Sequence, residues 1–173
     1  MTPDNDLHWY VAYVKSCCER KAAETLASAG VETYLPIQKE IRQWSDRRKL
    51  VERLVLPHMI FVRCTVHDRV KTLEQCPYLT RYMSNRGPYN PVVVPDIQME
   101  AFRCMVERGG RQVSAGEEVL IPGDRVRITS GPLSGLECEL VKVGERRCIA
   151  VRLGGLVTAR MDLERDTIEK IKE

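Results

Sequence analysis

The sequence predicts an α+β fold, in which a ferredoxin-like sandwich of helices and strands is followed by a small β-barrel. Up to residue 108, strand and helix patterns interleave in the order β-α-β(hairpin)β-α-β-α, which suits a ferredoxin-like sandwich. From residue 119, short strands and tight turns follow one another without a long helix, which is typical of a small barrel. A chain of 173 residues is long enough for two such domains.

The segment between the two halves, residues 109–118, is rich in glycine and charge and lacks apolar periodicity. Such a composition is typical of a linker. We therefore predict a first domain at residues 1–108 and a second at residues 119–173.

The longest apolar stretch, Arg53–Cys64, predicts a central strand of the first domain. Because side chains alternate along a strand, Met59, Phe61 and Arg63 share one face. The opposite face holds Ile60, Val62 and Cys64, an ordinary core set. The first set suits either a second packed layer or a surface that meets a partner.

A strand is also predicted at Trp9–Lys15, with Trp9, Val11 and Tyr13 on one face. Ser16 and Glu19 follow with the spacing of a capping box, which predicts a helix from there to about Ala29. Further along, Ser45–Arg48 form a polar turn between two extended arms, so we expect a hairpin. Its cations are Lys39, Arg42, Arg47, Arg48, Lys49 and Arg53.

Two more helices are predicted in the first domain. One spans Asp68–Gln75, with Val70 and Leu73 facing inward, and ends before a proline. The other follows Pro95 and Asp96 and stops at the Gly109-Gly110 pair. Its expected inner face is Ile97, Ala101, Phe102 and Met105.

The net charge is +3, and the excess lies in the first 110 residues, which hold 16 Lys and Arg against 13 Asp and Glu. This imbalance is compatible with a surface that faces nucleic acid or with ordinary solvated charge. The remaining residues hold 11 of each sign, so the part of the chain that contains the predicted barrel is neutral.

The seven cysteines are odd in number, and none are spaced as Cys-x-x-Cys or combined with histidine at metal-ligand spacing. We expect reduced, structural thiols and neither metal nor cofactor. The polar start of the chain is unlike a signal peptide, and no apolar stretch is long enough to span a bilayer. We expect a cytoplasmic protein without a membrane partner.

Catalysis is not predicted. Cys17, Cys18 and the histidines at positions 8, 58 and 67 offer the residue types of a nucleophile and a base. However, no nucleophile motif is present, and the sequence places no Asp or Asn to orient them.

Two motifs carry a resemblance to a known family. The pattern Gly123-Asp124-x-Val126-x-Ile128-x-x-Gly131-Pro132-Leu133-x-Gly135-Leu136 looks like a KOW motif. Its glycines are expected to adopt positive φ at a tight hairpin, while Val126 and Ile128 fill the barrel. In the first half, Trp9-Tyr10 opening a strand and the later Leu56–Val62 look like the N-terminal domain of NusG proteins. Across its length the chain resembles the NusG family of transcription factors.

The resemblance implies an NGN domain with its β-hairpin, followed by an SH3-like KOW barrel. It also implies a non-catalytic, monomeric elongation or antitermination factor that binds the clamp helices of RNA polymerase, suppresses pausing or termination, and recruits another factor through the KOW domain. Carried over by position, the clamp-binding residues are Trp9, Tyr13, Leu56, Met59 and Phe61. Contacts with the polymerase gate loop would come from Arg69, Lys71 and Thr72.

Contact with non-template DNA would come from another edge of the domain, around the first helix start and after the second helix. Helix N-termini, cations and an exposed tyrosine suit phosphates and unpaired bases. The residues are Lys15, Arg20, Lys21, Tyr78 and Arg81. The hairpin cations Arg47, Arg48 and Lys49 leave three readings open: contact with nucleic acid, contact with the polymerase, or solvation.

In the KOW domain, the residues that correspond to the partner-binding loop are Ile128, Gly131, Pro132, Leu133 and Gly135. Leu133 stands where a Phe is usual, and that Phe helps general factors to grip a ribosomal protein or Rho. Cys138 replaces another usual glycine, so the turn there must accept a Cβ. Together with Met59 in place of an aromatic residue, these departures predict a specialised paralogue for selected operons, similar to RfaH or to the antiterminators of capsule synthesis in Bacteroides. The alternative is a KOW-type protein that binds RNA or the ribosome, which the neutral barrel disfavours.

Overall fold

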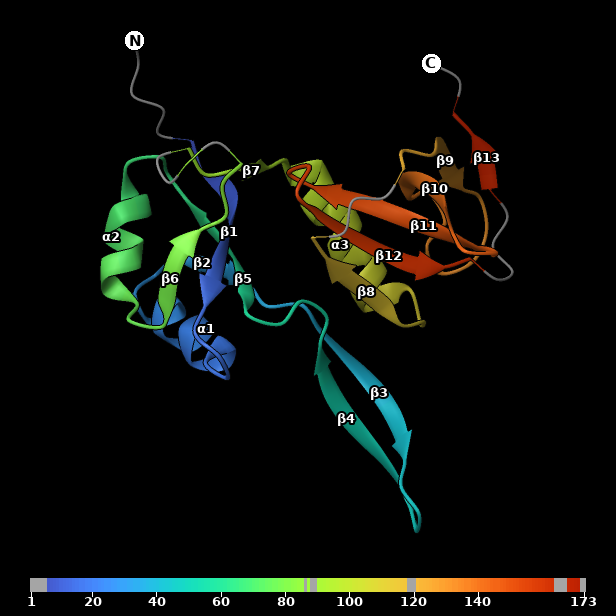
Figure 1. Ribbon diagram of the computed structural model, residues 1–173, viewed down its shortest axis with the longest axis horizontal. Helices are drawn as coiled ribbons and strands as arrows, with labels where there is room; N and C mark the ends of the chain where they lie inside the picture. The colour runs from blue at the N-terminus through green and yellow to red at the C-terminus, as the bar shows by residue number, and fades with distance from the viewer. Residues whose placement is uncertain (1–5, 86, 88–89, 118–120, 164–167, 172–173) are drawn as a thin grey trace. The chain divides into compact units, whose positions relative to one another are not determined.

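The computed structural model has the predicted α+β class (Figure 1). It describes residues 6–85, 87, 90–117, 121–163 and 168–171. The chain divides into two compact units, unit 1 with residues 1–36 and 56–96, and unit 2 with residues 37–55 and 97–173.

Unit 1 is built on a sheet with the strand order β2-β5-β1-β6, and β7 also pairs with β1. Its strands are β1 (His8–Val14), β2 (Glu32–Tyr34), β5 (Met59–Cys64), β6 (Leu79–Tyr82) and β7 (Val93–Val94). The central strands β1 and β5 are antiparallel, with Tyr13 opposite Met59 and Trp9 opposite Arg63. This register confirms the expected central strand and its alternation.

Two helices, α1 (Glu19–Ser28) and α2 (Asp68–Gln75), pack on one face of this sheet. Ala22 and Leu26 of α1 lie in a buried cluster with Ile60 and Val62, the predicted core set of β5. Leu73 of α2 packs against the same cluster, as expected, whereas Val70 is exposed. Thr72 takes the buried position instead, and its hydroxyl donates to the Asp68 carbonyl.

The predicted capping box at the start of α1 does not form. Cys18 occupies the N-cap without a side-chain hydrogen bond, and Cys17 has a φ of 59°. Glu19 is buried, and its carboxylate accepts the backbone N–H of His58 at 3.0 Å. Glu19 therefore accepts a hydrogen bond from His58, far along the chain, instead of forming the predicted capping box with Ser16.

Unit 2 contains a six-stranded antiparallel sheet with the order β13-β9-β10-β11-β12-β8. Its strands are β8 (Val113–Gly116), β9 (Asp124–Ile128), β10 (Glu137–Val143), β11 (Arg146–Leu153), β12 (Val157–Asp162) and β13 (Ile168–Lys170). Val126 and Ile128 are buried, as expected for barrel-filling residues. Strand β8 falls inside residues 109–118, the expected linker, of which residue 118 lies outside the described residues. The predicted domain boundaries stay a prediction.

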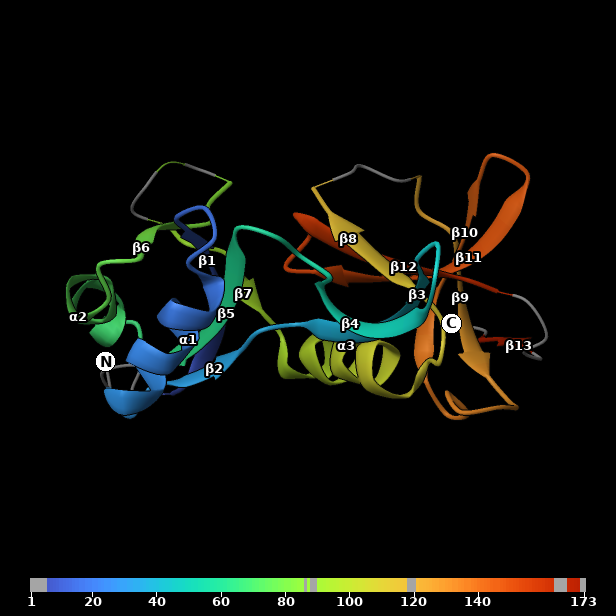
Figure 2. The ribbon, with the colours of Figure 1, turned by 90° about the horizontal axis from the view of Figure 1, so that it is seen from below.

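Helix α3 (Asp96–Arg108) packs on the strands of unit 2, as Figure 2 shows. Gln98 accepts the backbone N–H of Gly154 at 2.9 Å. At the end of the helix, a Cβ on Gly109 would lie 2.5 Å from the backbone carbonyl oxygen of Met105, so only glycine fits at this position. The expected inner face is partly wrong, because Ile97 is exposed and Met99 is buried in its place.

The glycines of the KOW-like motif serve two different purposes. Gly131 and Gly135 have φ values of 83° and 90°, which confirms the expected positive φ in the turn between β9 and β10. Gly123 does not have positive φ; a Cβ there would lie 1.8 Å from the Leu140 carbonyl oxygen. Cys138 lies within strand β10 opposite Val126, so the turn expected at this position is wrong.

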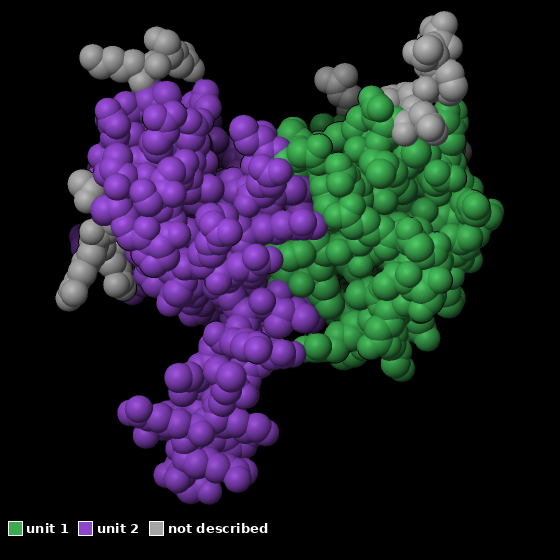
Figure 3. Space-filling view, turned by 180° about the vertical axis from the view of Figure 1, so that it is seen from behind, with its two compact units in different colours: residues 1–36, 56–96 green, residues 37–55, 97–173 purple. Residues whose placement is uncertain are grey.

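The hairpin predicted around Ser45–Arg48 is present as β3 (Ile37–Gln43) and β4 (Arg48–Leu54). It belongs to unit 2 and projects from it (Figure 3). No helix within the described part of the chain is long and apolar enough to cross a membrane.

Candidate functional site

The face of the unit 1 sheet opposite α1 and α2 brings together four of the residues predicted to bind the polymerase clamp. The β1–β5 register places Trp9, Tyr13, Met59 and Phe61 on this one face. Arg63 lies on it as well, with its guanidinium carbon 5.7 Å from the centre of the Trp9 ring. We call the set Trp9, Tyr13, Leu56, Met59 and Phe61 the clamp face.

Most of the clamp face is inaccessible in the folded chain. The exposed fraction is 3% for Trp9, 8% for Met59 and 0% for Phe61, and Leu56 is buried too. The Phe61 ring also lies 6.2 Å from that of Tyr34. Tyr13 is the half-exposed member, so it is the part of this face that a partner can reach directly.

Tyr13 also links the clamp face to the predicted nucleic-acid residues. The Arg81 guanidinium carbon lies 4.3 Å from the centre of the Tyr13 ring, close enough for a cation–π contact. At the end of β1, the Lys15 backbone N–H donates to the Tyr78 carbonyl at 2.9 Å. Three residues of the predicted nucleic-acid set therefore gather where β1 meets β6.

The other two members of that set, Arg20 and Lys21, are exposed in the first turn of α1. The same turn holds the buried carboxylate of Glu19, 3.7 Å from the His58 Nδ1. A carboxylate in the first turn already interacts with the positive end of the helix dipole. Any phosphate bound here would depend on the Arg20 and Lys21 side chains more than on the helix itself.

The three residues expected to contact the polymerase gate loop all lie on α2, but they differ in exposure. Lys71 is exposed and Thr72 is buried. Arg69 is half-buried: its Nε donates to the Val66 carbonyl at 3.0 Å, and its guanidinium carbon lies 5.4 Å from the centre of the Tyr10 ring. Lys71 is thus the most accessible of the three.

The buried thiols of the chain are poor nucleophiles. Cys64 lies 3.8 Å from the hydroxyl of Tyr82, and burial raises the pKa of both groups. Burial likewise raises the pKa of the Cys138 thiol to about 12. Since the thiolate is the reactive form, these cysteines are structural in character. All seven cysteines are free, and the described residues contain no cluster of three or more metal-ligating side chains.

The predicted partner-binding residues of the KOW domain divide between the core and the surface. Ile128 and Leu133 are fully buried in the barrel. Gly131, Pro132 and Gly135 are exposed in the turn, which is closed by a hydrogen bond from the Gly135 N–H to the Ile128 carbonyl at 2.7 Å. Leu133 is therefore a packing residue rather than a surface contact.

A groove of about 880 Å³ runs between α3 and strands of the barrel. Glu100, Arg103, Glu107 and Arg108 line its helix side, so acidic and basic residues are equal in number there. On the barrel side, Arg152 pairs with Glu139 at 3.0 Å. This balance of charge favours no particular class of ligand.

A family model described as "Transcription termination factor nusG" matches residues 7–103, more than half of the chain. The chain belongs to the NusG family. The proteins of this family are non-catalytic transcription factors, in agreement with the absence of a nucleophile motif from the sequence. A search of curated proteins finds no significant match.

The likeness of the fold to a solved NusG structure extends over nearly the whole chain. A structure of NusG from Thermotoga maritima, described for its domain interaction, is 22% identical, with a TM-score of 0.52. The alignment covers 96% of this chain and 98% of that one. A crystal structure of an MjSpt4:Spt5 complex is 13% identical, with a TM-score of 0.32, and covers 95% and 99% of the two chains.

Sequence reasoning missed one surface of this NusG-family chain, the apolar residues of the β3–β4 hairpin. Ile41, Trp44 and Leu50 are all exposed, with exposed fractions of 70%, 58% and 59%. The sequence held a signal for Trp44, because it directly precedes the predicted polar turn. A residue beside a tight turn at the end of a long hairpin has few neighbours to bury it.

Proposed function

We propose that this NusG-family chain is a transcription elongation and antitermination factor, which binds the clamp helices of RNA polymerase through the clamp face and suppresses pausing or termination. The observation that carries the proposal is the β1–β5 register, which gathers Trp9, Tyr13, Met59 and Phe61 on the face opposite α1 and α2. Aromatic and methionine side chains are enriched at the centres of protein interfaces.

Binding through the clamp face requires a step that exposes it, because Trp9, Met59 and Phe61 are buried. Tyr13 is accessible before that step and provides a first contact. The nearby Arg81 would then be free to leave the Tyr13 ring for a phosphate. This order of events joins the polymerase contact to a contact with non-template DNA, to which Lys15, Lys21, Arg20 and Tyr78 would contribute.

The KOW domain is proposed to recruit a second factor through its exposed turn. Gly131, Pro132 and Gly135 are accessible to such a partner, whether a ribosomal protein or Rho. Leu133 is buried and lacks the aromatic ring that general factors present here. This difference supports the proposal of a specialised paralogue that serves selected operons.

The proposal is tested by binding of the full chain to bacterial core RNA polymerase, with Tyr13→Glu compared with the wild type. Because Tyr13 is half-exposed, the variant is expected to fold, and an unpaired charge in the interface should weaken binding at least about tenfold. Ala27→Glu, on the exposed side of α1, is the matched control and should bind normally. Equal affinities for wild type and Tyr13→Glu would contradict the clamp face.

A transcription assay on a template with a defined pause site measures the consequence of binding. The wild type should shorten the pause, and Tyr13→Glu should not. A protein that binds the polymerase but leaves every pause and terminator unchanged would contradict the elongation role while leaving the binding site intact.

A further inference from the structure

The tip of the β3–β4 hairpin is a surface of unusual composition. Every residue from Ile41 to Leu50 is exposed. These ten residues hold four cations, Arg42, Arg47, Arg48 and Lys49, against the single anion Asp46. Their formal charge of +3 equals that of the entire chain. Figure 1 shows the hairpin extending away from the sheet of unit 2, and in Figure 3 it is the projecting part of that unit.

Strand pairing sorts the tip into two faces. Trp44 and Arg47 are joined by a backbone hydrogen bond of 2.8 Å across the turn, and Arg42 pairs with Lys49 two positions further along the strands. Because strand side chains alternate, Arg42, Trp44, Arg47 and Lys49 share one face, which we call the cationic face. The other face presents the cross-strand pair Ile41 and Leu50.

The cationic face has a destabilising arrangement. Arg42 lies directly opposite Lys49, and like charges at opposed positions of a strand pair repel. Arg42 is bound to Glu40, a carboxylate it shares with Arg53. Among the described residues, Arg47, Arg48 and Lys49 form no ion pair. An anionic partner would relieve this repulsion.

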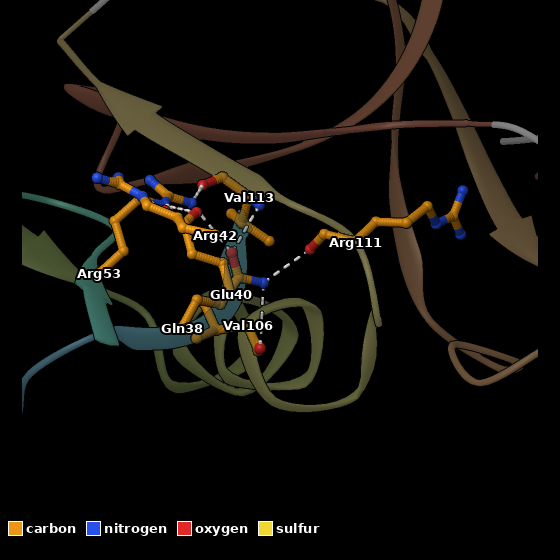
Figure 4. Close-up of polar contacts among 7 residues, drawn as sticks. All are labelled: Gln38, Glu40, Arg42, Arg53, Val106, Arg111 and Val113. Atoms are coloured by element: carbon orange, nitrogen blue, oxygen red, sulfur yellow. Dashed lines mark hydrogen bonds and ion pairs between the residues drawn. The ribbon is translucent and has the colours of Figure 1, made fainter. Parts of the chain in front are cut away.

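The base of the hairpin is held firmly by hydrogen bonds within unit 2 (Figure 4). The Gln38 amide nitrogen donates to the carbonyls of Arg111, at 2.7 Å, and Val106, at 3.4 Å. The Gln38 amide oxygen accepts the N–H of Val113 at 2.9 Å and a guanidinium N–H of Arg53 at 3.1 Å. The same Arg53 nitrogen donates to the Val113 carbonyl. A fixed base holds the exposed tip in position, which lowers the entropic cost of binding.

We propose that the tip of the β3–β4 hairpin binds single-stranded nucleic acid, with Trp44 stacked on an unpaired base and Arg42, Arg47 and Lys49 on the flanking phosphates. Cations beside an exposed aromatic ring are the combination that binds single strands with little sequence preference. The formal charge of +3 on ten exposed residues favours a polyanion as the partner. This site is separate from the clamp face and does not depend on it.

The test is equilibrium binding of the full chain to labelled oligonucleotides of mixed sequence, as single-stranded RNA, single-stranded DNA and duplex DNA. Trp44→Ala should weaken binding to single strands by about fivefold or more, since each stacked base contributes substantially to affinity. Arg47→Gln, Arg48→Gln and Lys49→Gln together should reduce the magnitude of the slope of log affinity against log salt by about 1.4, because Arg47 and Lys49 each neutralise one phosphate. Binding to single-stranded RNA alone would identify a transcript as the ligand. Binding to single-stranded RNA and single-stranded DNA alike would support a site that stacks a base and binds phosphates of either strand.

A matched control separates a local site from general charge. Arg108→Gln, Lys142→Gln and Arg147→Gln remove the same number of exposed cations elsewhere in unit 2, and the salt slope should change little. The proposal is overturned if the control set weakens binding as much as the tip set, or if Trp44→Ala leaves single-strand affinity unchanged. Duplex DNA bound as tightly as single strands would also overturn it, and so would a tip that binds core polymerase but no oligonucleotide.

Discussion

The clamp face and the hairpin tip are both rich in large apolar side chains, yet they differ in almost every other respect. Trp9 and Phe61 are buried on one face of the unit 1 sheet, and the Arg63 guanidinium carbon lies 5.7 Å from the centre of the Trp9 ring. Trp44 is exposed, and four cations lie within the same ten residues. A side chain's type therefore says little about its role until its exposure and its neighbouring charges are known.

This contrast assigns different kinds of contact to the two regions. Apart from Tyr13, the residues of the clamp face can contribute binding energy only when they are uncovered, so most of the contact with a partner is coupled to a structural change. The hairpin tip is accessible already, so its contacts depend on charge and respond to salt.

The largest expected effect is on the free energy of unfolding, which a substitution in the clamp face should lower far more than one in the hairpin tip. Phe61→Ala should lower the free energy of unfolding by about 3–5 kcal/mol, because it removes a fully buried aromatic side chain. Trp44→Ala should change it by no more than about 0.5 kcal/mol. Chemical denaturation measures both, and a large loss of stability in Trp44→Ala would contradict the exposure of the tip.

The next effect separates the base of the hairpin from its tip. Gln38→Ala should lower the free energy of unfolding by about 1–3 kcal/mol, because backbone groups of the half-buried Arg111 and the buried Val113 lose their hydrogen-bond partner. Gln43→Ala lies on the same strand but is exposed, and it serves as the control with no expected change. If the two variants unfold at the same denaturant concentration, the base is not held as described.

The smallest expected effect is the pH dependence of stability that the buried Cys138 thiol causes. The Cys138 pKa rises from 9.0 to about 12 on folding, because burial disfavours the thiolate. Between these values the unfolded chain loses the proton and the folded chain keeps it. The contribution of this thiol to the free energy of unfolding is therefore fully present below pH 9 and is lost as pH rises toward 12. Cys138→Ala should make this decline shallower in denaturation experiments at pH 7 to 10.5, and an unchanged slope would contradict the burial of this thiol.

Much of the fold could be predicted from the sequence, because its local patterns are strong. The alternation in Met59–Cys64 identified the central strand and its two faces, and α2 has the expected bounds. Strand β8 was missed because Val113 is its only large apolar residue, and its pairing with β12 depends on residues more than 40 positions away. The predicted capping box is also absent because of a contact that is distant in sequence, since the Glu19 carboxylate accepts the His58 backbone N–H.

The candidate site was less predictable than the fold. Alternation shows which residues share a face, but whether that face is covered depends on tertiary contacts that no local pattern contains. For this reason Phe61 and Leu133, both expected at interfaces, are buried, whereas Ile97 and Val70, both expected in the core, are exposed. Gly123 is a further case, because its close approach to Leu140 involves a strand that comes later in the chain.

Site-specific photo-crosslinking tests the division of roles most directly. A photoreactive amino acid is placed at position 13 in one sample and at position 44 in another, and each is assembled with core RNA polymerase on a nucleic-acid scaffold. Position 13 is expected to crosslink to the polymerase clamp, and position 44 to a single strand of nucleic acid. Crosslinks from position 44 to protein alone, or none from position 13 to the polymerase, would contradict this division of roles.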